Sequence, residues 1–107
     1  MRDAMSMHAC MMDTFPPIIY LNEASKAIVR SVQDFNESKG EVACGYTFDA
    51  GPNAHVYCLE KNAGEVRKML SQVEGVEQTI VSGVGKGPRL IENEKKHLLD
   101  AEGCLKR

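Results

Sequence analysis

Residues 42–59 read Val-Ala-Cys-Gly-Tyr-Thr-Phe-Asp-Ala-Gly-Pro-Asn-Ala-His-Val-Tyr-Cys-Leu, and this stretch decides the fold. Apolar and polar residues alternate on both sides of a central segment, 49–53, as they do in half-buried strands. The Gly-Pro-Asn sequence within that segment is typical of a tight turn. The stretch therefore predicts a β-hairpin whose first strand turns one set of side chains inward: Val42, Cys44, Tyr46 and Phe48.

The hairpin also predicts a register. If Phe48 faces Ala54 across a loop of residues 49–53, two further pairs follow on the same side of the sheet, Tyr46 with Val56 and Cys44 with Cys58. We expect these two thiols to be near neighbours, buried and reduced, because no secretory signal directs them to an oxidising compartment.

Asp49 lies where the first predicted strand ends. Such junctions often carry catalytic groups, because rigid structure fixes the side chain and leaves one side open. An Asp before Gly-Pro-Asn is also ordinary turn chemistry, with the carboxylate accepting backbone N–H bonds. The local pattern alone favours the turn interpretation and leaves the catalytic one open.

Helical spacing flanks the hairpin. Residues 2–12 read as the end of a helix, and Asp13 or Thr14 is expected to cap the next one, with Pro16-Pro17 in its first turn. Gly40 is expected to end that second helix. One buried stripe runs along it: Leu21, Ala24, Ile28, Val32 and Phe35.

The C-terminal half contains one clear helix and one apolar run. Val66, Met69, Leu70 and Val73 indicate an amphipathic helix that Gly75 closes. Thr79 to Val84 predicts a third strand, and a short helix is expected near Lys95–Leu99. This order predicts an α+β fold, an antiparallel sheet with helices packed on one face, in a single domain over residues 1–107.

Composition excludes several classes of function. A net charge of −2 and a pI near 5.9 give no basic field for nucleic acid, and the apolar runs are too short to span a membrane. The four cysteines form no zinc spacing, and His8, His55 and His97 lie too far apart to suggest a metal site. The glycine-rich segment 83–87 departs from known phosphate loops and predicts a plain turn.

Two motifs resemble a known family. Residues 13–22, Asp-Thr-Phe-Pro-Pro-Ile-Ile-Tyr-Leu-Asn, followed by Tyr-Thr-Phe-Asp-Ala-Gly-Pro-Asn-Ala at 46–54, resemble the C-terminal part of diphosphomevalonate decarboxylase. That family belongs to the superfamily of galactokinase, homoserine kinase and mevalonate kinase. Its closing pattern also matches at 80–81, 84–88, 97–99 and 103. Residues 3–9 depart from the family, reading Asp-Ala-Met-Ser-Met-His-Ala where it has Asp-Ser-Asn-Gln-Phe-His-Ala.

The resemblance implies a split β-α-β (ferredoxin-like) domain and a reaction. The family uses ATP and Mg²⁺ to convert mevalonate 5-diphosphate to isopentenyl diphosphate, in isoprenoid and sterol precursor synthesis. It implies that Asp49 assists the substrate 3-hydroxyl, supported by the loop residues Ala50, Gly51, Pro52 and Asn53. It also implies a cytoplasmic homodimer.

The family's phosphate-binding loop and the residues that hold the substrate diphosphate lie upstream of these motifs. We therefore expect ATP and Mg²⁺ to be bound mainly by an N-terminal domain that this chain lacks, and Met1 to be an internal start. Two alternatives remain: a non-catalytic α+β binding or dimerisation module, or a related mevalonate kinase that does not decarboxylate.

Overall fold

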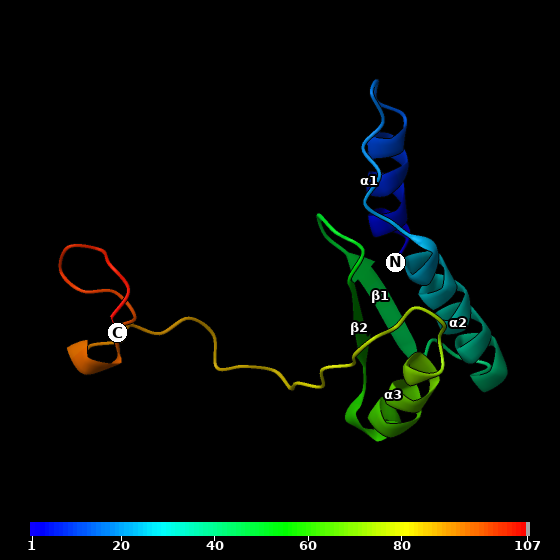
Figure 1. Ribbon diagram of the computed structural model, residues 1–107. Coiled ribbons are helices and arrows are strands. Elements are labelled where there is room, and N and C mark those ends of the chain that lie inside the picture. The colour runs from blue at the N-terminus through cyan, green and yellow to red at the C-terminus, as the bar shows by residue number, and fades with distance from the viewer. Residues whose placement is uncertain (107) are drawn as a thin grey trace.

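The computed structural model describes residues 1–106. Its elements are α1 (Arg2–Met12), α2 (Glu23–Lys39), β1 (Cys44–Phe48), β2 (Ala54–Cys58), a 3₁₀ turn (Glu60–Asn62), α3 (Ala63–Ser71) and a second 3₁₀ turn (Glu94–Lys96). β1 and β2 form a two-stranded antiparallel sheet, and the predicted α+β class is confirmed. Figure 1 shows α2 running beside the hairpin and α3 packed near the end where β1 begins and β2 ends.

The predicted hairpin register is confirmed. Phe48 pairs with Ala54, Tyr46 with Val56, and Cys44 with Cys58. β1 begins at Cys44, two residues later than expected, and Val42 is 77% exposed.

The predicted burial of both paired thiols is wrong for one of them. Cys44 and Cys58 are both free, but only Cys44 is buried. The helices pack over β1, so the end of β2, where Cys58 lies, stays in solvent.

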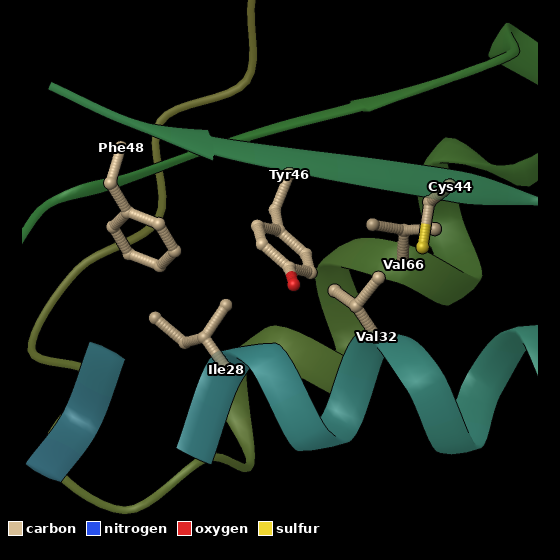
Figure 2. Close-up of a cluster of buried hydrophobic side chains, with 6 residues drawn as sticks. All are labelled: Ile28, Val32, Cys44, Tyr46, Phe48 and Val66. Carbon is tan, nitrogen blue, oxygen red and sulfur yellow. The ribbon is translucent and has the colours of Figure 1, made fainter. Parts of the chain in front are cut away.

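The core lies between β1 and two helices, α2 before it in the chain and α3 after it. Figure 2 shows three side chains of β1 pointing toward α2, with Val66 of α3 closing one side. The alternation of β1 is what aims every second residue at the helices. The six buried core residues are Ile28, Val32, Cys44, Tyr46, Phe48 and Val66.

The predicted start of the second helix is wrong. α2 begins at Glu23 with Asn22 as its N-cap, not at Asp13 or Thr14. The Asn22 side chain accepts a hydrogen bond from the Ser25 backbone N–H, and the Ser25 hydroxyl accepts one from the Asn22 N–H, which is a reciprocal capping box. The two prolines disfavour helical backbone in the residues before them, so the chain runs irregularly from α1 to this cap.

The helix ends agree better with the sequence. Gly40 closes α2 in the left-handed region, at φ 67°, as predicted. α3 ends at Ser71, and Gly75 (φ 85°) belongs to the turn that follows it.

The predicted third strand over 79–84 is wrong for the part of the chain that is described. This stretch has irregular, extended backbone, and Ile80 and Val84 are 83% and 105% exposed. β-branched residues form a strand only when a neighbouring edge accepts their hydrogen bonds, and none lies beside this segment. Figure 1 shows the yellow-to-orange trace leaving the sheet and ending in a separate turn, where Leu99 bridges to Leu105.

This extended segment sets the overall dimensions. The radius of gyration is 18.2 Å. A compact domain of similar length would have a value of about 13 Å. The packed part of the molecule is therefore the N-terminal three quarters, which includes the hairpin loop.

Candidate functional site

Asp49 occupies the position that the sequence predicted, directly after β1. Its side chain is 81% exposed, and the loop that follows, 49–53, joins β1 to β2. Strand pairing fixes both ends of this loop, since Phe48 and Ala54 face each other. The carboxylate therefore projects from a rigid base into open solvent.

One side chain contacts the Asp49 carboxylate within the described residues. His55 Nε2 of β2 lies 3.4 Å from Asp49 Oδ2, and His55 is itself half exposed. In the sequence, His55 is only a histidine too far from His8 and His97 to suggest a metal site. The register could have revealed the contact. Phe48 pairs with Ala54, and Asp49 directly follows Phe48 in the sequence, as His55 directly follows Ala54.

Two of the loop residues, Gly51 and Asn53, show no specific contact with the described residues. Gly51 has no positive φ, and a Cβ there would meet nothing within 4 Å, so no described neighbour requires a glycine. Asn53 is exposed and forms no hydrogen bond with the described residues. The loop backbone is held instead by the Ser25 hydroxyl, which donates to the Pro52 carbonyl at 2.8 Å.

A second side chain holds the base of the loop. His8 of α1 is buried, and its Nε2 lies 3.3 Å from the carbonyl oxygen of Phe48, the residue before Asp49. Its ring also packs edge-on against Tyr20 and Phe48. Nothing in the local sequence around His8 indicates this contact, because Phe48 lies 40 positions away.

The described residues contain no group of three or more His, Cys, Asp or Glu side chains that could hold a metal ion. The N-terminus of α2 is capped by its own Asn22 and Ser25, so this helix end is not a free phosphate site. The glycine-rich segment 83–87 is exposed and has no regular secondary structure, so it forms neither the predicted turn nor a loop that opens a helix.

A surface hollow between α2 and α3 lies away from Asp49. A cavity of about 370 Å³ opens between α2 and α3, lined by residues that include Asp34, Phe35, Met69 and Gln72. No residue of the 49–53 loop lines it. We place the candidate site at Asp49 because strand geometry and exposure favour it, and the hollow holds no group of catalytic side chains.

No described helix combines the length and the apolar character that crossing a membrane requires. This finding concerns residues 1–106 alone.

Comparisons with known proteins identify the family. The mevalonate 5-diphosphate decarboxylase C-terminal domain matches residues 1–78, and the chain belongs to this family. Diphosphomevalonate decarboxylase of Schizosaccharomyces pombe is 36% identical over 130 residues, covering 96% of this chain and 33% of the relative. The structure of mevalonate diphosphate decarboxylase from Trypanosoma brucei superposes with a TM-score of 0.60 at 28% identity, covering 74% of this chain and 26% of that one.

The chain spans about a third of the length of the curated relatives it matches. The match is also longer than the chain. Diphosphomevalonate decarboxylase of Rattus norvegicus, 33% identical, aligns over 142 residues with all 107 of this chain, so the relative carries about 35 residues without counterparts here. The match to the family domain ends at residue 78, whereas the alignment with the rat relative extends over the whole chain.

Proposed function

We propose that residues 1–107 are one domain of an ATP-dependent decarboxylase that converts mevalonate 5-diphosphate to isopentenyl diphosphate. The observation that carries the proposal is the exposed Asp49 at the end of β1, within the family's Thr-Phe-Asp-Ala-Gly-Pro-Asn motif. Family membership supports the reaction class.

The chemistry gives Asp49 a defined task. The substrate hydroxyl is a tertiary alcohol, which is a poor nucleophile until its proton is removed or polarised. A carboxylate within hydrogen-bond reach can accept that proton. The loop residues Ala50, Gly51, Pro52 and Asn53 would support the position of the Asp49 carboxylate beside the substrate. The paired strands on both sides fix where this loop begins and ends.

ATP and Mg²⁺ would be held outside this segment. The described residues offer neither a phosphate-binding loop nor a cluster of metal ligands. We therefore place nucleotide and diphosphate binding in a separate, N-terminal domain of the whole protein. Isoprenoid and sterol precursor synthesis, a cytoplasmic location and a homodimeric state are further parts of the proposal, and they rest on the resemblance to the family.

The test is Asp49→Asn in the full-length protein. Asparagine keeps the size of the side chain but cannot take the proton, so turnover should fall at least about 100-fold while substrate affinity changes little. The measurement is ATP-dependent release of labelled carbon dioxide under steady-state conditions. Asp34→Asn, the same exchange at an exposed position of α2, is the matched control and should retain activity.

Turnover of Asp49→Asn near that of the unmodified protein would contradict the assignment. That outcome would favour a non-catalytic α+β module instead.

A further inference from the structure

Two polar side chains are buried in the described part of the chain, His8 at 1% exposure and Ser25 at 0%. Burying a polar side chain costs free energy unless it forms hydrogen bonds. Both form a bond to a backbone carbonyl, and the two carbonyls belong to Phe48 and Pro52. These residues flank Asp49 on its two sides within a few positions.

The His8 contact determines its protonation pattern. A carbonyl oxygen only accepts, so Nε2 must carry the hydrogen that points at the Phe48 oxygen 3.3 Å away. The ring is wedged between Tyr20 and Phe48, with both ring centroids 6.2 Å away. His8 therefore contacts Phe48 twice, through a hydrogen bond to its carbonyl and through its ring. These contacts connect the end of β1 to α1.

The Ser25 contact reaches the other side of the loop. Its hydroxyl oxygen lies 2.8 Å from the Pro52 carbonyl and 3.0 Å from Asn22 Oδ1. A hydroxyl has one hydrogen, and Asn22 Oδ1 already accepts from the Ser25 N–H at 2.9 Å. The Ser25 hydroxyl therefore donates its hydrogen to the Pro52 carbonyl. Through this bond the capping box also holds the loop at the start of α2.

We propose that His8 and Ser25 are positioning residues for Asp49, holding the carbonyls on either side of it so that the carboxylate meets the substrate in one orientation. This inference rests on the proposed function. Neither side chain touches Asp49, and both act through the backbone. Misplacing a catalytic group by about 1 Å can cost about 100-fold in rate, so loss of either bond should lower turnover.

The experiment uses the full-length protein and compares kcat with KM. Ser25→Ala and His8→Phe remove one donor each, and each should lower kcat about tenfold or more with KM changed less than about twofold. His8→Gln places an amide N–H near the position of Nε2 and should recover most of the kcat lost in His8→Phe. Assays are run well below the melting temperature of every variant.

The matched control is Asn36→Ala at the opposite end of β1. The Asn36 side chain donates to the Cys44 carbonyl and accepts from the N–H groups of Ala43 and Cys44, so it clamps the same strand in the same way. Its loss should lower the melting temperature at least as much as Ser25→Ala does and leave kcat unchanged. A purely structural role for Ser25 and His8 predicts that all three variants behave alike.

The outcomes separate the two proposals. Loss of kcat in Asp49→Asn, Ser25→Ala and His8→Phe, but not in Asn36→Ala, supports both. Loss in Asp49→Asn alone, or equal loss in Asn36→Ala, overturns the positioning role and leaves Asp49 catalytic. An unchanged Asp49→Asn overturns the catalytic role of Asp49 and the positioning role with it.

Discussion

Cys44 differs from the other thiols of the chain in its burial. It lies in the core with 2% exposure, and this burial, with the nearby Cys58 thiol as a smaller cause, raises its pKa. The thiolate is the reactive form of cysteine, so a buried thiol with a raised pKa reacts slowly.

We predict that iodoacetamide at pH 8 will modify Cys10, Cys58 and Cys104 in the native protein at least about tenfold faster than Cys44. These three thiols are exposed. Mass spectrometry of tryptic peptides measures the four rates. In concentrated urea all four should react at similar rates, and equally fast labelling of Cys44 in the native state would contradict the packing of β1 against α2.

Two groups of the strand β1 together make the stability of the fold depend on pH. Burial raises the pKa of the Cys44 thiol above its ordinary value of 9.0 and that of the Tyr46 phenol above 10.0. Both groups therefore keep their protons to higher pH in the folded state than in the unfolded state. Their contribution to stability is complete below the ordinary values and is lost as pH rises through the raised ones.

We predict that the urea midpoint falls between pH 8 and pH 11, and that Tyr46→Phe makes the fall smaller. Phenylalanine has no proton to lose, so the part of the fall due to Tyr46 disappears. Tyr57→Phe is the control, because Tyr57 is 66% exposed on β2. If both substitutions change the pH dependence equally, Tyr46 is not the group responsible.

The elements differ in how far the sequence predicts them. The hairpin register follows from residues 42–59 because alternation has a period of two and a slip of one position would turn Phe48 outward. The start of α2 differs from the prediction because Pro16-Pro17 does not begin a helix here, and the Asn22–Ser25 pair, three residues apart, forms the capping box instead. The strand expected at 79–84 failed because pairing depends on a neighbour that local sequence does not encode.

The residues of the candidate site also differ in how far the sequence predicts them. Asp49 is predictable from the strand end and the turn that follows it, together with the family motif. His8 and Ser25 are not, because His8 meets Phe48 across 40 positions and Ser25 meets Pro52 across 27. Only the packing of α1 and α2 against the hairpin brings these groups together.

At the scale of the whole molecule, residues 1–107 contain one carboxylate of the proposed reaction and no described site for phosphate groups. We predict that the purified 107-residue chain releases no carbon dioxide from mevalonate 5-diphosphate in the presence of ATP and Mg²⁺. It should bind this substrate weakly at best, because an acidic side chain repels an anionic ligand.

Scintillation counting of carbon dioxide from carboxyl-labelled substrate measures this outcome. The full-length protein at the same molar concentration is the positive control. Release by the 107-residue chain above the rate without enzyme would show that the chain holds the diphosphate itself.

The closeness in sequence of the core residues has a consequence for folding. Every member of the buried cluster lies between Ile28 and Val66, so α2, the hairpin and α3 can assemble through short chain loops, which close quickly. α1 joins that nucleus from outside it, through Met5 and His8. The last native contact to form, and the first to open in local unfolding, should therefore be the one between α1 and Phe48. Amide hydrogen exchange would then be faster in α1 than in α2, and each opening of α1 would release the strand end that carries Asp49.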